Sequence, residues 1–183
     1  GWNSNGALGD GTATNRNVPT QESTGASNWT SASAGESHTA ALKSDGTLWS
    51  WGWNKYAQLG DGTTTNRNVP TQESTGASNW TAVAAGAFHT VALKSDGTLW
   101  AWGSNWYGEL GDGTTGQVLI GRTTPVQELT GSSNWTAIAA GDGLTIALKS
   151  DGTLWAWGSN EEGQLGDGTS NDRNVPTQES TGA

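Results

Sequence analysis

The stretch that decides the fold is Ala92-Leu-Lys-Ser-Asp-Gly-Thr-Leu-Trp-Ala-Trp-Gly103. Close copies of it stand at residues 41–52 and 147–158. Each copy predicts two short strands joined by Ser-Asp-Gly, a tight turn in which glycine adopts a positive φ without a steric clash. Trp100 and Trp102 point to one face of the second strand, and Leu99 and Ala101 point to the other. Because both faces are apolar, we expect both to be buried.

The composition indicates an all-β chain. The 183 residues include 28 glycines and 12 tryptophans, and only 14% are charged. Low charge and abundant glycine also occur in disordered chains, but those are poor in aromatic residues. Stretches with apolar residues at helical spacing are missing, because glycine and asparagine interrupt each of them.

Charge and cysteine content exclude several classes of function. A net charge of −9 argues against nucleic acid as a partner, since phosphate binding needs a basic patch. The absence of cysteine excludes disulfides, thiolate catalysis and cysteine-based metal sites. No apolar run reaches the ~20 residues that a membrane-spanning helix needs. The chain does not begin with methionine, so we expect a processed chain or an excerpt of a longer one.

The sequence repeats with a period of about 50 residues, which is typical of propeller blades and solenoids. We divide it into a single array of units 1–51, 52–102 and 103–157 with a half-unit 158–183. The third unit carries four extra residues within 116–121, where an insertion predicts a surface loop.

Each unit has room for four short strands. In the second unit we expect an edge strand with proline at 69–73, then strands at 80–85, 89–94 and 98–102. Four antiparallel strands per unit match the size of a propeller blade, and stacked blades would bury both faces of each hairpin.

The motifs Ala-Gly-x-x-His-Thr-x-Ala-Leu, Asp-Gly-Thr-Leu-Trp-x-Trp-Gly and x-Asn-x-x-Gly-x-Leu-Gly-Asp-Gly recur in phase over essentially the whole chain. They strongly resemble the RCC1 (regulator of chromosome condensation) repeat. The resemblance implies a β-propeller, usually seven-bladed, whose repeats are offset from its blades. Members of the family serve as nucleotide-exchange factors, scaffolds and an ultraviolet photoreceptor. The photoreceptor motif Gly-Trp-Arg-His-Thr is replaced by Gly-Trp-Asn here, so that role is not carried over.

Three blades and a spare half-repeat with its proline-containing strand cannot close a ring, because propellers need about 4–8 blades. We therefore expect part of a larger ring or assembly, either an excerpt of a longer repeat protein or an open arc. Edge strands without a pairing partner favour association with another protein chain, above all self-association with a second copy.

Aromatic residues in the Gly-x-Asn-x-x-Gly loops are candidates for binding a ligand or a protein partner, because these loops differ between copies. Stacking on sugars makes carbohydrate a second candidate ligand; covering the blade edges is the structural alternative. The loop candidates are Trp2, Trp53, Tyr56, Trp106 and Tyr107. The tryptophans assigned to the structural core are Trp49, Trp51, Trp100, Trp102, Trp155 and Trp157.

Other polar positions are interpreted as structural. His38 and His89 share one repeat position that holds Leu144 in the third copy, so we expect core histidines bonded to the backbone. The Gly-Asp-Gly-Thr segments invite a calcium interpretation but lack Asp-x-Asp-x-Asp spacing, so the aspartate is expected to cap a turn. These aspartates are Asp10, Asp61, Asp112 and Asp167. No catalytic constellation, metal site or cofactor site is predicted.

Three Asn-Trp-Thr triplets match the N-glycosylation acceptor pattern, at Asn28, Asn79 and Asn134. Because the match follows from the repeat, we interpret it as structural unless a glycosylating cell secretes the chain.

The leading hypothesis is a non-enzymatic protein-interaction or assembly module, placed outside the cell or on its surface by the acidic, Thr- and Asn-rich composition with few lysines. The first alternative is an intracellular regulator of a GTPase, of the guanine-nucleotide-exchange type, with a basic surface on the partner. The second is a carbohydrate-binding module that uses the loop aromatics.

Overall fold

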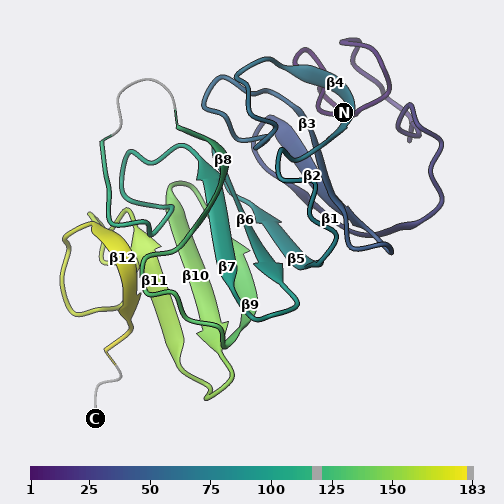
Figure 1. The fold of residues 1–183 in the computed structure, drawn as a ribbon. Coiled ribbons are helices and arrows are strands. Elements are labelled where there is room, and N and C mark those ends of the chain that lie inside the picture. The colour runs from purple at the N-terminus through teal and green to yellow at the C-terminus, as the bar shows by residue number, and fades with distance from the viewer. Residues whose placement is uncertain (117–120, 181–183) are drawn as a thin grey trace.

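A computed structural model describes residues 1–116 and 121–180, and within them all regular structure is β (Figure 1). The strands form three separate four-stranded antiparallel sheets, as the repeat pattern predicts. The first sheet contains β1 (Trp29–Ala34), β2 (His38–Lys43), β3 (Leu48–Gly52) and β4 (Arg67–Gln72). The second contains β5 (Trp80–Ala85), β6 (His89–Lys94), β7 (Leu99–Gly103) and β8 (Arg122–Gln127). The third contains β9 (Trp135–Ala140), β10 (Leu144–Lys149), β11 (Leu154–Gly158) and β12 (Arg173–Gln178).

Each sheet is a meander whose outermost strand comes from the following sequence unit. In the first sheet β3 ends at Gly52, and β4, which pairs with it, lies in the unit that starts there. The sheets are therefore offset from the units, as the resemblance implies. The unit boundaries are drawn from the sequence repeat and do not coincide with the ends of the sheets.

The proline-containing strands lie at sheet edges, as proline requires. Pro70, Pro125 and Pro176 stand in β4, β8 and β12, each paired on one side only. The prediction of a spare fourth strand of this kind is wrong, because residues 17–22 around Pro19 form no strand. Each paired strand of this type lies against the last hairpin strand of a sheet, and no sheet precedes Pro19. The four-residue insertion predicted to form a surface loop falls on 117–120, outside the described residues.

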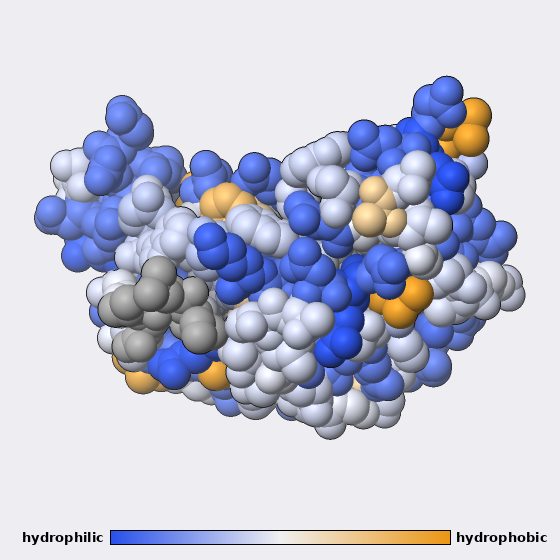
Figure 2. All heavy atoms as spheres, turned by 90° about the horizontal axis from the view of Figure 1, so that it is seen from above, coloured by the Kyte–Doolittle hydropathy of each residue, from blue (hydrophilic) through white to orange (hydrophobic). Residues whose placement is uncertain are grey.

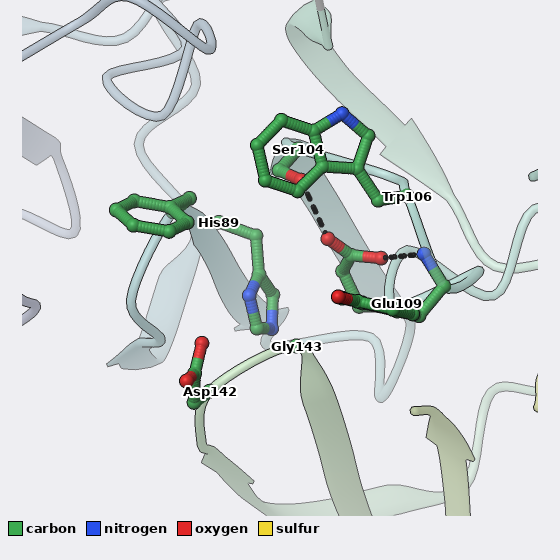
Figure 3. Close-up of a pocket in the computed structure, with 8 residues that line it drawn as sticks. His89, Ser104, Trp106, Glu109, Asp142 and Gly143 are labelled. Atoms are coloured by element: carbon green, nitrogen blue, oxygen red, sulfur yellow. Dashed lines mark hydrogen bonds between the residues drawn. The ribbon is translucent and has the colours of Figure 1, made fainter. Parts of the chain in front are cut away.

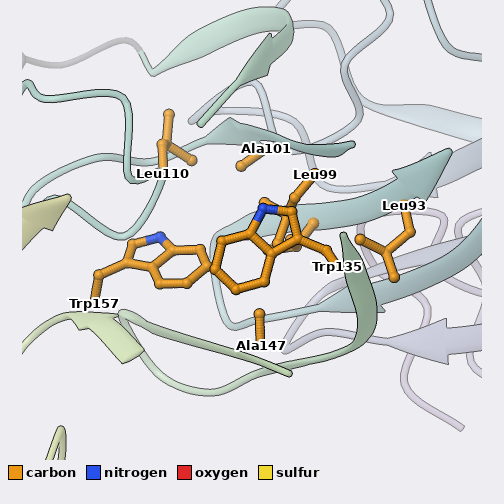
Figure 4. Packing of buried hydrophobic residues seen from close by; sticks show 8 residues of the cluster. Leu93, Leu99, Ala101, Leu110, Trp135, Ala147 and Trp157 are labelled. Carbon is orange, nitrogen blue, oxygen red and sulfur yellow. The ribbon is translucent and has the colours of Figure 1, made fainter. Parts of the chain in front are cut away.

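The sheets stack so that the leucine face of one packs against the tryptophan face of the next. At the first junction Leu42 and Leu48 of the first sheet contact Trp80 and Trp102 of the second. At the second junction Trp135 and Trp157 of the third sheet pack below Leu99, Ala101 and Leu110 (Figure 4). The first strands of neighbouring sheets also meet, since β1 contacts β5 and β5 contacts β9. The hairpin therefore has both faces covered in the second sheet, the only one described with neighbours on both sides.

The two outer faces of the stack show the same chemistry, and no described residue covers their exposed side chains. On the third sheet, Leu148 and Leu154 are each 38% exposed, whereas the equivalent Leu93 and Leu99 are buried. On the first sheet, Trp29 is half-buried where the equivalent Trp80 is buried. One end of the stack thus presents a leucine face and the other a tryptophan face.

The hairpin turn fits closely into the neighbouring backbone. Gly97 has a φ of +78°, and a Cβ there would stand 2.1 Å from the carbonyl oxygen of Ser133. The glycine is therefore required both by its dihedral angle and by the space available.

Candidate binding site at the loop end

The long loops that follow β3, β7 and β11 lie at one end of the sheets, together with the short β1–β2, β5–β6 and β9–β10 loops. We call this the loop end. A buried asparagine holds each long loop in shape. Asn54 accepts a hydrogen bond from the amide of Leu59 at 3.0 Å and donates to the carbonyl groups of Thr63 and Thr65 at 3.1 Å. Asn3, Asn105 and Asn160 occupy the same position in their own loops. The loop frame is therefore constant while its tip varies.

The aspartates of the Gly-Asp-Gly-Thr segments are engaged by their own loops. Asp10 accepts hydrogen bonds from the amide and hydroxyl of Thr12 at 2.9 and 2.7 Å, and pairs with Arg16 at 2.7 Å. The Thr12 hydroxyl, together with the Arg16 guanidinium, holds the pKa of Asp10 at about 2. Asp61, Asp112 and Asp167 form the same pairs with Arg67, Arg122 and Arg173. These carboxylates therefore stabilise the turns of their own loops. Residues 1–116 and 121–180 hold no cluster of metal-ligating side chains.

The two histidines link successive sheets. His89 is fully buried, and its Nε2 lies 3.0 Å from the Thr145 hydroxyl, which itself donates to the Glu109 carbonyl. Because that hydroxyl proton is already used, Nε2 is the donor to Thr145. The expected bond to the backbone is therefore wrong: the partner is a side chain of the next sheet. His38 makes the same bond to Thr90. Burial lowers the pKa of His89 to about 4 and of His38 to about 3.

Four aromatic side chains from three loops form one cluster at the loop end. Trp53 and Tyr56 lie with ring centroids 5.2 Å apart, and both rings pack edge-on against Phe88. Trp106 joins the cluster at 4.8 Å from Tyr56 and is itself 41% exposed. The structure thus brings together three of the five predicted loop aromatics. Phe88 was missed, although it stands in a repeat position that otherwise holds Ser37 and Gly143.

The other two predicted loop aromatics lie differently. Tyr107 is 38% exposed and lines a cavity beside Trp106. Trp2, 60% exposed, forms no aromatic pair among the described residues. The surface view shows hydrophobic residues scattered singly on the face it presents (Figure 2). Among the five predicted loop aromatics, Trp2, Trp106 and Tyr107 are the exposed ones.

The cavity opens at the second junction, between the loop that follows β7 and the β9–β10 loop (Figure 3). Its volume is about 200 Å³. Glu109 stands in its wall with only 2% of the residue exposed; its carboxylate accepts hydrogen bonds from the Ser104 hydroxyl at 2.7 Å and the Tyr107 amide at 2.8 Å. Burial raises the pKa of Glu109. The lining residues are Phe88, His89, Ser104, Trp106, Tyr107, Glu109, Asp142 and Gly143.

The six tryptophans assigned to the core divide into two groups. Trp51, Trp102 and Trp157 are buried and donate their indole N–H groups to the carbonyls of Ala7, Gln58 and Glu109. Trp49, Trp100 and Trp155 are half-buried, and a lysine ammonium lies over each ring, as Lys94 does at 4.0 Å from Trp100. The second group therefore lies at the boundary between core and solvent.

The three Asn-Trp-Thr triplets each combine an exposed asparagine with a tryptophan that is buried or half-buried. Asn28, Asn79 and Asn134 are exposed, while the tryptophan that follows Asn79 is buried and donates to the buried carboxylate of Glu73 at 3.2 Å. The asparagines are accessible on the surface, and glycosylation there stays a prediction.

Comparison with known proteins agrees with this architecture. The profile of the regulator of chromosome condensation (RCC1) repeat matches residues 1–42, 45–93, 96–148 and 151–181. The chain belongs to the RCC1-repeat family. A second profile of the same family matches 29–58, 80–109 and 135–164, segments that begin at the first strand of each sheet.

The relatives are longer than this chain. The ultraviolet-B receptor UVR8 of Arabidopsis thaliana is 40% identical over 146 residues, which are 79% of this chain and 32% of that protein. The crystal structure of human WBSCR16 superposes with a TM-score of 0.85 at 26% identity, over 99% of this chain and 47% of that one. Yeast RCC1 in its complex with Kap60 superposes with a TM-score of 0.76 at 24% identity, over 86% and 38%. The chain thus spans about a third to a half of these proteins.

No helix that is long and apolar enough to cross a membrane occurs in the described ranges.

Proposed function

We propose that this array of RCC1 repeats is a non-enzymatic interaction module that binds a protein partner through its loop end. The observation that carries the proposal is the aromatic cluster of Trp53, Tyr56, Phe88 and Trp106, continued by Tyr107. Rigid aromatic side chains at the border of core and solvent supply most of the binding energy in many protein interfaces. The cluster is built from the variable tips of constant loops, and such positions commonly carry recognition.

A structural relative supports a partner of this class. Yeast RCC1 has been solved bound to the protein Kap60. Its likeness to this chain concerns the fold, so the identity of the partner is left to experiment.

The loop-end proposal is tested by affinity capture with quantitative mass spectrometry from the source cells. We expect Trp106→Ala and Tyr107→Ala to reduce recovery of a specific protein at least about tenfold, a loss of about 1.4 kcal/mol. Ser95→Ala, in an exposed hairpin turn at the opposite end of the sheets, serves as the matched control. Equal recovery of that protein by the wild type and all three variants would contradict the proposal.

We also propose that the two outer faces pair with each other in successive copies of the chain. Both internal junctions join a leucine face to a tryptophan face. The exposed Leu148 and Leu154 stand at the positions of the buried Leu93 and Leu99, and Trp29 and Trp51 stand at those of Trp80 and Trp102. A head-to-tail contact of a second copy would therefore repeat an interface that the chain already forms twice.

Analytical ultracentrifugation tests this pairing. We expect the mean mass of the chain to rise with concentration, and Leu148→Asp to keep it at the monomer mass of 18.9 kDa. A wild-type chain that remains monomeric at all concentrations would exclude self-association.

The location outside the cell stays a prediction from composition, and secretion of the full-length gene product by its native host would test it. Carbohydrate binding and guanine-nucleotide exchange stay alternatives. Loss of glycan-array binding in Trp53→Ala and Trp106→Ala would favour the first, and accelerated nucleotide release from a GTPase would favour the second.

A further inference from the structure

The cavity at the second junction exists because two large side chains of the first junction have small counterparts there. At the first junction Trp53 and Phe88 pack against each other with centroids 5.6 Å apart. The equivalent positions at the second junction hold Ser104 and Gly143. Both of these residues line the cavity. Removing two aromatic side chains from the same place in the repeat leaves room for part of a ligand.

The cavity also carries two carboxyl groups that the first junction lacks. Glu109 replaces Gln58, and Asp142 replaces Ala87. Neither carboxylate forms a salt bridge with any residue of 1–116 or 121–180. Figure 3 shows both groups around the same opening, Glu109 in the wall and Asp142 on the β9–β10 loop. Asp142 is exposed, so it lies at the mouth.

The charge of Glu109 is not required by the fold. In the following repeat Gln164 accepts a hydrogen bond from the Glu162 amide at 3.0 Å and donates to the Ser159 hydroxyl at 3.2 Å. These bonds join the same positions that Glu109 joins through Tyr107 and Ser104. A side-chain amide at this position therefore makes both hydrogen bonds that the loop needs. A buried carboxylate makes them too, but adds a desolvation penalty. A cation that enters the cavity would offset that penalty.

Aromatic rings complete the site. Trp106 and Tyr107 are exposed and line the cavity, and Phe88, which also lines it, packs edge-on against Trp106 with ring centroids 6.2 Å apart. Aromatic faces attract cations, and a planar guanidinium both stacks on them and donates paired hydrogen bonds to carboxylates. Each oxygen of Glu109 accepts one hydrogen bond within the chain, which leaves further acceptor capacity.

We propose that this cavity is a pocket for the guanidinium group of an arginine side chain, presented by the protein partner. The inference rests on the proposed interaction at the loop end and names the chemistry that the partner contributes. The guanidinium stacks against Trp106 and Tyr107 and donates to Glu109 and Asp142. His89 forms the floor and stays neutral, since burial holds its pKa at about 4.

The experiment is an NMR titration that follows the indole N–H of Trp106. Three probes are compared: N-acetylarginine amide, N-acetyllysine amide, and the uncharged isostere N-acetylcitrulline amide. We expect the arginine probe to bind at least about tenfold more tightly than the citrulline probe, and more tightly than the lysine probe. Equal binding of arginine and citrulline, or tighter binding of lysine, would overturn the guanidinium assignment.

Two variants locate the probe. Glu109→Gln keeps the hydrogen bonds that Gln164 demonstrates, so we expect the variant to fold and to bind the arginine probe at least about tenfold more weakly. Glu161→Gln makes the same change of net charge at an exposed residue that does not line the cavity, and should bind like the wild type. Unchanged binding in Glu109→Gln would overturn the pocket.

Failure of the arginine pocket can be distinguished from failure of the proposed loop-end interaction. If partner capture requires Trp106 but tolerates Glu109→Gln, the loop-end interface stands and the arginine pocket falls. If the arginine probe binds in the cavity while capture is indifferent to Trp106, the cavity binds a guanidinium group, but its presentation by a loop-end partner falls together with the proposed function.

Discussion

The two junctions between sheets share one framework and differ at a single end. Both pack leucines on tryptophans, both join a histidine to a threonine of the next sheet, and both bond a buried indole to a loop carbonyl. At the loop end the first junction is filled by Trp53 and Phe88, while the second holds a cavity with Glu109 in its wall. Positions that repeat therefore specify the fold, and positions that diverge are the places to look for recognition.

The largest expected effect tests the shared framework. Trp102→Ala and Trp157→Ala should each lower the free energy of unfolding by about 3–5 kcal/mol, because both indoles are fully buried between sheets. Urea unfolding followed by circular dichroism measures it. Trp106→Ala, at the exposed tip, should cost less than about 1 kcal/mol. A cost below about 1 kcal/mol for either buried tryptophan would show that the junctions are not equivalent.

Acid should weaken both junctions. Folding holds His89 neutral with a pKa of about 4, below its ordinary value of 6.5, so the unfolded chain binds the proton more readily. Stability present above pH 6.5 is then lost as the pH falls toward 4, by about 1.4 kcal/mol per pH unit for each such histidine.

Unfolding of wild type and of His89→Leu between pH 7 and 4 measures this loss. The variant introduces the residue type that the third copy carries as Leu144, and it should show a shallower pH dependence. Identical slopes would mean that the histidine is not held neutral.

A smaller effect is expected where glycine lies against an indole. Gly60→Ala and Gly111→Ala place a Cβ 2.6 and 2.7 Å from Nε1 of Trp102 and Trp157, at positive φ. Each should cost about 1–3 kcal/mol by thermal or urea unfolding. Gly76→Ala is the control, since it has the same positive φ and open space around it. If all three cost the same, the contact with the indole contributes nothing.

The smallest effect separates the junctions. Burial raises the pKa of Glu109, so its charged form destabilises the fold at neutral pH. Glu109→Gln should therefore be more stable than wild type at pH 7, and the difference should shrink as the pH falls toward the ordinary pKa of 4.5. Gln58→Glu should shift stability in the opposite direction. A Glu109→Gln variant less stable than wild type at pH 7 would contradict the assigned cost of the charge.

Most of the fold follows from periodicity within the sequence. Strand β5 lies where the sequence predicts it, at Trp80–Ala85, and the hairpin strands differ by one residue at most. Local patterns suffice there because each of these strands pairs with a strand that is adjacent in the sequence. The segment around Pro19 matches Pro70 in sequence yet forms no strand, because pairing needs a sheet edge that no local pattern supplies.

The site was less predictable. Sequence variation drew attention to Trp53, Tyr56 and Trp106, but not to the junction that holds the cavity. A cavity arises from what is missing, here the side chains that Ser104 and Gly143 lack, and two distant loops must be superposed before the gap is visible. Glu109 could have been found as the only acid at a position that holds Gln58 and Gln164.

The offset between units and sheets determines how such a protein can be shortened, extended or recombined. A break at Gly52 would separate β4 from the three strands it completes, whereas a break between Gln72 and Trp80 leaves whole sheets on both sides. Interchangeable cassettes would therefore run from one Trp-Thr strand to the next proline-containing strand. An unequal crossover at the unit boundary would still supply each hairpin with the same kind of fourth strand.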